Sequence, residues 1–159
     1  MDPLSRDGGG LCWRHDLNIT DPSIVVGVAP PMELRYFTPA HAGRALVLVR
    51  RVVEDVVQRY ARLVELEEVI ERAEQADMTA QLGAAREELV DTVDHLQMFM
   101  EELSQLGVEL RDCRRGIVDF PAKHNGRPVC LCWMRGEETI QYWHECDEGF
   151  ASRQPIEWE

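Results

Sequence analysis

The chain has 159 residues, a formal net charge of −12 and a sequence pI near 4.8, and 45% of its residues are hydrophobic. This length predicts one domain with a modest core, and the ordinary apolar content excludes a wholly disordered chain. The negative charge argues against nucleic acid and against an anionic membrane surface as partners, because binding to either needs clustered cations.

The sequence also predicts a compartment and a domain boundary. No apolar run approaches the roughly 18–20 residues of a membrane span, and the start of the chain lacks the layout of a signal peptide. Five cysteines are an odd number, and a chain of this size has little need of disulfides. We therefore expect a protein of the reducing cytoplasm. Residues 1–33, with their glycines and prolines, are predicted to be a flexible extension, and residues 34–159 a single domain.

Two apolar stripes predict a helical hairpin over residues 38–106. Thr38 is a good N-cap for the first helix, and Asp77 or Thr79 is expected to cap the second. Gly107 stands where a left-handed residue would end the second helix. The first stripe has spacings of three, four and seven, and the second alternates three and four like a coiled-coil seam. The stripes consist of Leu46, Val49, Val53, Val56, Tyr60, Leu63 and Ile70, and of Leu82, Ala85, Leu89, Thr92, Leu96, Phe99, Leu103 and Leu106.

Turn signals allow the strands that follow to be placed in register. A two-residue turn at Asn125 and Gly126 puts Asp119 opposite Cys132. A second turn about residues 136–137 is expected to put Cys132 opposite Gln141. Because paired residues share a face, one face should cover the helices and the other should be polar. The predicted inner face holds Val118, Phe120, Val129, Leu131, Trp133, Ile140 and Tyr142, and the outer face holds Ile117, Asp119, Cys130, Cys132, Gln141 and Trp143.

Short motifs occur in a recognisable order along the chain. They are Tyr-Phe-Thr at 36–38, Gly-Ile-Val-Asp-Phe-Pro at 116–121, Leu-Cys-Trp at 131–133, Gly-Glu at 136–137, Tyr-Trp-His at 142–144 and Glu-Gly-Phe at 148–150. This order resembles the bacterial family DUF2203, a domain of unknown function, from Arg35 to about Ile156. The resemblance implies no activity, cofactor or partner. The chain departs from the family pattern in its longer N-terminal extension and in Ser152, where a glycine is expected.

The leading candidate site lies on the predicted outer face of the sheet. A carboxylate and an amide among aromatic residues can bind a small polar ligand or the peptide of a partner. The structural alternative is that Asp119 accepts an ion pair, with Arg153 as the first choice of donor and Arg127 as the second. The candidate residues are Asp119, Cys132, Gln141, Trp143 and Arg153.

Two sharper hypotheses concern the cysteines. Zinc can be held by thiolates and imidazole, and the candidate ligands here are Cys130, Cys132, His144 and Cys146. In structural zinc sites, however, two to four residues separate the first two cysteines, whereas one residue separates Cys130 from Cys132. The predicted register also places His144 on the inner face, where it is expected to be a core histidine. Cys132 as a nucleophile is disfavoured because Asp119 would raise the pKa of the thiol. We therefore predict no metal, no cofactor and no catalytic residue.

The predicted fold class is α+β: a long antiparallel helical hairpin, followed by a small antiparallel sheet of three to four strands over residues 108–156 that packs on it. The two stripes exceed what such a sheet can cover, so a homodimer through the helices is expected. The predicted function is a non-enzymatic, self-associating interaction or scaffold domain with room for a protein partner. The alternative is a small-molecule or metal-binding protein, an enzyme included, that uses the polar face of the sheet.

Overall fold

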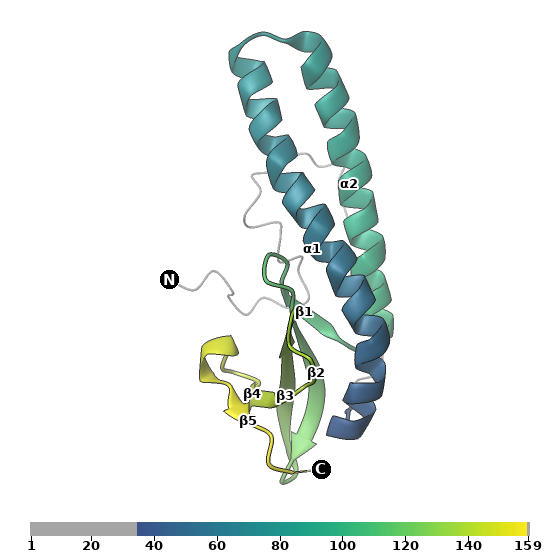
Figure 1. Ribbon diagram of the computed structural model, residues 1–159, viewed down its shortest axis with the longest axis vertical. Helices are drawn as coiled ribbons and strands as arrows, with labels where there is room; N and C mark the ends of the chain where they lie inside the picture. The colour runs from purple at the N-terminus through teal and green to yellow at the C-terminus, as the bar shows by residue number, and fades with distance from the viewer. Residues whose placement is uncertain (1–34, 159) are drawn as a thin grey trace.

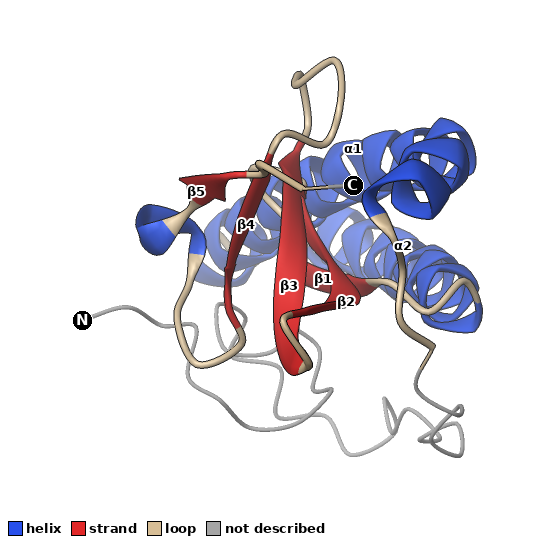
Figure 2. Ribbon diagram, turned by 90° about the horizontal axis from the view of Figure 1, so that it is seen from below, coloured by secondary structure: helices blue, strands red, loops and turns tan. Residues whose placement is uncertain are grey.

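The computed structural model describes residues 35–158, which form a helical hairpin and a five-stranded antiparallel sheet with strand order β1-β2-β3-β4-β5 (Figure 1). The sheet packs against one side of the hairpin (Figure 2). The predicted α+β class is confirmed, with five strands in place of three to four; the predicted extension, residues 1–33, lies outside the described residues. The elements are α1 (Pro39–Gln75), α2 (Thr79–Gln105), β1 (Glu109–Asp112), β2 (Ile117–His124), β3 (Arg127–Met134), β4 (Tyr142–Glu145), the 3₁₀ helix η1 (Phe150–Ser152) and β5 (Gln154–Pro155).

The start of α1 and the end of α2 follow the sequence prediction, and the start of α2 does not. The hydroxyl oxygen of Thr38 accepts a hydrogen bond from the backbone N–H of His41 at 3.1 Å, as an N-cap does. Gly107 follows α2 with a φ of 80°, the left-handed conformation that was predicted. The prediction for the start of α2 was wrong, because Met78 stands at its N-cap without a capping side chain. Asp77 adopts a φ of 52° in the turn, and Thr79 already belongs to the helix.

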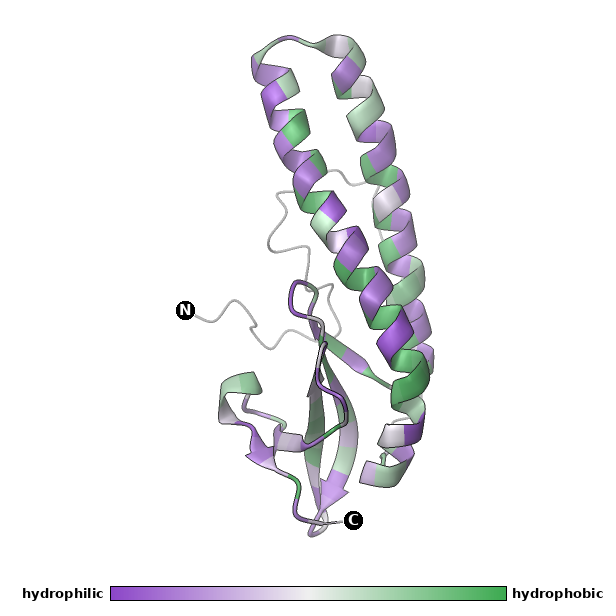
Figure 3. Ribbon diagram, in the orientation of Figure 1, coloured by the Kyte–Doolittle hydropathy of each residue, from purple (hydrophilic) through white to green (hydrophobic). Residues whose placement is uncertain are grey.

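The core lies where the lower half of α1 meets the sheet. The alternating apolar and polar bands along both helices show the helical periodicity (Figure 3). One cluster joins the first turns of α1 to β2 and β3, and a second joins the middle of both helices. The largest fully buried side chains of these clusters are Trp133, Phe120, Leu131, Tyr60, Leu63 and Leu96. Neither described helix is apolar enough over a sufficient length to cross a membrane.

Most of both apolar stripes of the hairpin is covered within a single chain. In α1, Val49, Val53 and Val56 are fully buried, and in α2 Leu96 and Leu103 are buried as well. The stripe residues that stay half-buried are Ile70, Leu82, Leu89, Phe99 and Leu106. The sequence argument for a dimer relied on apolar surface left over after folding, and the hairpin and the sheet bury most of that surface between them. The homodimer remains a prediction.

The register of β2 and β3 is the predicted one, with Asp119 opposite Cys132. Between β3 and β4 the predicted register was wrong by one residue: Cys132 faces Tyr142, not Gln141. The connection spans residues 135–141 and includes irregular backbone after its turn, so it does not close as a tight hairpin. The shift exchanges the faces of β4. Trp143 turns inward to the core, and His144 turns to the outer face.

Candidate functional site

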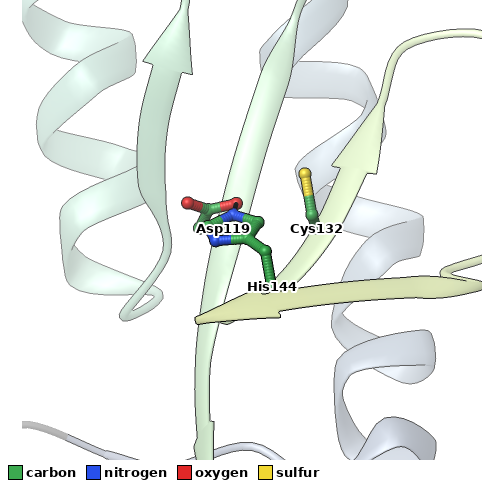
Figure 4. Close-up of side chains that lie close together, drawn as sticks. All are labelled: Asp119, Cys132 and His144. Atoms are coloured by element: carbon green, nitrogen blue, oxygen red, sulfur yellow. Dashed lines mark hydrogen bonds and ion pairs between the residues drawn. The ribbon is translucent and has the colours of Figure 1, made fainter. Parts of the chain in front are cut away.

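A buried polar cluster occupies the outer face of the sheet, away from the helices. Asp119 on β2, Cys132 on β3 and His144 on β4 lie side by side on this face (Figure 4). Their relative exposures are 1%, 0% and 2%. One carboxylate oxygen, the thiol sulfur and one imidazole nitrogen all lie within 4.8 Å of one another. Strand pairing brings these residues together, since Asp119 is opposite Cys132 and His144 is opposite Cys130.

His144 uses both of its ring nitrogens. Nδ1 lies 2.7 Å from the backbone carbonyl oxygen of Glu145, and Nε2 lies 3.0 Å from Oδ1 of Asp119. A carbonyl oxygen can only accept a hydrogen bond, so Nδ1 carries the hydrogen. Burial alone would lower the pKa of His144, but the hydrogen bond to Asp119 and its charge raise it above the ordinary value. In the metal-free cluster Asp119 therefore favours the protonated form of the ring.

Arg111 supplies a second cation to the same carboxylate. Its Nε donates a hydrogen bond to Oδ2 of Asp119 at 2.8 Å. Arg111 is the extra residue of a β-bulge in β1, because Leu110 pairs with Val118 and Asp112 already pairs with Ile117. Bulges re-aim side chains, and this one directs the guanidinium to the cluster. Although burial opposes it, the charge of Asp119 raises the pKa of Arg111.

The predicted donors to Asp119 were both wrong. Arg153 pairs with Glu137 at 2.8 Å, and its guanidinium carbon lies 3.8 Å from the ring centroid of Phe150. Arg127 pairs with Glu145 at 2.6 Å. Arg153 follows η1, at the β5 edge of the sheet, whereas Arg111 approaches from the opposite edge strand. The carboxylate therefore receives its guanidinium from the strand next to its own.

The thiols of the cluster are poor nucleophiles in this arrangement. Burial raises the pKa of Cys132, and the charge of Asp119 and a hydrogen bond to it raise it further. Burial and the charge of Asp119 raise the pKa of Cys130 in the same way. The four cysteines of the described residues are in the thiol form. The geometry therefore gives no support to Cys132 as an attacking thiolate in the absence of a metal.

The predicted site residues separate in the structure. Asp119 and Cys132 lie together as expected, but Gln141 is exposed and precedes β4. Trp143 is buried in the core on the other face, and its neighbour His144 takes the place beside Asp119. The candidate row thus loses Gln141 and Trp143 and gains His144 and Arg111. Arg153 stays on the outer face, 4.4 Å from the ring centroid of Tyr142, which lies opposite Cys132, but it does not pair with Asp119. The alternation in Tyr142-Trp143-His144 carried the signal for His144, since one inward tryptophan requires an outward histidine.

The cluster has the donor atoms of a transition-metal site. Zinc takes cysteine sulfur, histidine nitrogen and carboxylate oxygen, and its bond lengths place the ligand atoms of a tetrahedral ion about 3.3–3.6 Å apart. The atoms here lie within 4.8 Å, so small side-chain rotations would bring them to that spacing. The hydrogen bond from Nδ1 of His144 to a backbone carbonyl is typical of a metal-bound histidine, because it fixes the ring with Nε2 presented to the ion.

The fold and the cluster define an α+β protein with a helical hairpin on one face of its sheet and a buried Asp-Cys-His group on the other. The chain belongs to the DUF2203 family, described as an uncharacterized conserved protein, whose model matches residues 35–156. The resemblance noted in the sequence is thereby confirmed. No curated protein and no solved structure matches the chain.

Proposed function

We propose that the protein binds a divalent transition-metal ion, zinc by preference, through Asp119, Cys132 and His144. The observation that carries this proposal is the convergence of three different ligand types, all buried, within 4.8 Å. The sequence raised two objections to a zinc site, and neither applies to this set of three ligands. The observed register puts His144 beside Cys132, and a three-residue ligand set does not need the closely spaced Cys130.

The charge of the site is compatible with an ion. Without metal and with His144 protonated, the two cations His144 and Arg111 face the carboxylates of Asp119 and Glu109, for a net charge of 0. A divalent ion bound to the Asp119 carboxylate, the Cys132 thiolate and a neutral imidazole, with Arg111 and Glu109 still in place, also gives 0. The ion replaces two protons, because the ligands bind in their deprotonated forms. Arg111 can therefore keep its hydrogen bond to Oδ2 while Oδ1 turns to the metal.

The proposed role is to hold the outer face of the sheet together and not to catalyse a reaction. The three ligands come from three adjacent strands, so an ion would connect β2, β3 and β4 across the sheet. They are also almost completely buried, which leaves a substrate no direct approach to the ion. Metal that binds only the folded state would stabilise it by about 4 kcal/mol at a free concentration a thousand times the Kd.

The test is metal content and metal affinity of the purified full chain. We expect one equivalent of zinc per chain by native mass spectrometry, and a cobalt-substituted protein with the thiolate-to-metal absorption of a cysteine ligand. Cys132→Ser and His144→Gln should each remove the bound metal. Cys113→Ser is the matched control, because Cys113 is a buried cysteine of the helical core and should leave metal binding unchanged.

Two outcomes would overturn the proposal. One is a chain that binds less than a tenth of an equivalent of zinc when zinc is present in excess. The other is stoichiometric binding that survives both Cys132→Ser and His144→Gln, which would place the metal elsewhere. If a variant fails to fold, the cobalt spectrum of the wild-type protein still reports whether a thiolate is a ligand.

A further inference from the structure

A second pair of cysteines lies beside the metal-ligand cluster. Sγ of Cys130 is 3.4 Å from Sγ of Cys146. Cys130 is on β3 and is 5% exposed, whereas Cys146 directly follows β4 and is exposed. Neither belongs to the three proposed metal ligands. The pair is therefore a separate chemical feature from the proposed metal site.

We propose that Cys130 and Cys146 are a site of reversible thiol oxidation, at which an intramolecular disulfide forms. The sulfur atoms of a disulfide are about 2.05 Å apart, so the two thiols must approach each other by roughly 1.4 Å. Cys146 can make this movement because it lies in a turn after the last residue of β4, where the backbone N–H of Glu148 bonds to the carbonyl of Glu145. Cys130 stays fixed in the middle of the sheet.

A low-molecular-weight disulfide such as oxidised glutathione can supply the oxidation. The exposed sulfur of Cys146, as thiolate, attacks one sulfur of the small disulfide and displaces its partner as a thiol, which leaves a mixed disulfide on Cys146. Burial raises the pKa of the Cys130 thiol, but this thiol already lies against the mixed disulfide. It attacks the Cys146 sulfur while its proton passes to the departing small thiolate, which leaves as the second thiol. Two protein thiols lose two electrons in all, the small disulfide is reduced to two thiols, and the two protons end on those thiols.

The exposure of Cys146 distinguishes this pair from the other described cysteines. Cys132 is fully buried, and Cys113 is 4% exposed within the helical core. An oxidant in solution meets Cys146 first, because it is the exposed member of the four. The thiol nearest to a mixed disulfide on Cys146 is then Cys130, at the contact distance already described. The site thus has an exposed cysteine that reacts first and a buried cysteine that resolves it.

The experiment uses the reduced full chain, freed of metal with a chelator, and equilibrated with mixtures of reduced and oxidised glutathione. Alkylation and mass spectrometry count the free thiols, and non-reducing peptide maps locate the bond. We expect two of the five thiols to be lost together and the peptides of Cys130 and Cys146 to be linked. Cys113→Ser and Cys12→Ser should keep the bond; Cys12 lies outside the described residues.

Two results would overturn the proposal. One is glutathione that remains on Cys146 while Cys130 stays reduced, which would show that the pair does not close. The other is that the only bond recovered joins two chains, which would make Cys146 an intermolecular site. Peptide maps of the wild-type protein decide between these results, so the test does not depend on whether Cys130→Ser folds. Because the metal has been removed, failure here leaves the zinc proposal untouched, and absence of zinc binding leaves this one untouched.

Discussion

Replacing Asp119 by asparagine in the metal-free protein removes the buried negative charge that lies between His144 and Arg111. The carboxylate is 1% exposed, its Oδ1 lies 3.0 Å from Nε2 of His144, and its Oδ2 lies 2.8 Å from Nε of Arg111. Breaking a buried ion pair by removing one partner costs about 3–5 kcal/mol. The Arg111 side chain is 34% exposed, so water recovers part of its hydration, and we expect the lower end, about 3 kcal/mol.

The measurement is urea denaturation in the presence of a chelator, with thermal melting as a second probe. For a domain of this size, about 3 kcal/mol corresponds to a fall in Tm on the order of 10 °C. Glu54→Gln is the matched control, because the ion pair of Glu54 with Arg135 is exposed on both sides and its loss should leave the free energy of unfolding nearly unchanged.

A double-mutant cycle separates the contribution of the pair from that of the single residues. Arg111→Met alone should cost less than Asp119→Asn, because His144 still faces the carboxylate. The double variant should lose less free energy of unfolding than the sum of the two single variants, by about 1 kcal/mol or more, because the two residues belong to one network. The reasoning fails if Asp119→Asn costs no more than Glu54→Gln, or if the two effects add.

Four further predictions concern other parts of the chain. Burial alone would raise the pKa of Asp112, but hydrogen bonds from Arg115 and neighbouring backbone N–H groups hold it below its usual value; its stabilisation is therefore present above the unfolded-state pKa and is lost as the pH falls through the lower folded-state value. In urea titrations Asp112→Asn should accordingly cost about 1 kcal/mol at pH 7 and progressively less as the pH falls through the folded-state pKa, and a cost that does not change with pH would contradict this. Gly116→Ala should cost roughly 2–3 kcal/mol by thermal melting, since Gly116 has a φ of +69° and a Cβ there would lie 2.8 Å from a neighbouring side-chain carbon; an unchanged Tm would refute it. Thr38→Ala should lower the free energy of unfolding by about 1 kcal/mol through loss of the N-cap, and Thr38→Ser should restore most of it. The homodimer should appear in light scattering as twice the 18.2 kDa chain mass at micromolar concentration, and a monomer would rule it out.

The parts of the fold that follow from local chemistry could be predicted from the sequence. The spacing of apolar residues and the special residues Thr38 and Gly107 define the hairpin, because capping and helical periodicity act within a few residues. Asn125 and Gly126 have φ values of 53° and 73°, which a tight two-residue turn requires. Such a turn leaves one register for β2 and β3, so the pairing of Asp119 with Cys132 could be derived.

The candidate site could be predicted only in part, because two of its residues depend on backbone irregularities. The connection over residues 135–141 has no fixed turn geometry, and a shift of one residue there was enough to hide His144 on the wrong face. Arg111 reaches Asp119 from a β-bulge, and an extra residue in a strand leaves no periodic signal. Strand connections and bulges are set by tertiary packing, which one sequence does not reveal.

The far end of the hairpin extends well past the sheet (Figure 1), and the core clusters that join helix to sheet lie in its lower part. Beyond Leu63, the buried apolar residues Leu66 and Ala73 of α1 and Ala85 of α2 belong to neither core cluster. The length of this arm is therefore independent of the sheet. Inserting seven residues into each helix near the turn would keep the seam in phase and lengthen the arm by about 10 Å. The sheet and the adjoining part of the hairpin would keep their structure while the length of the helical arm changed.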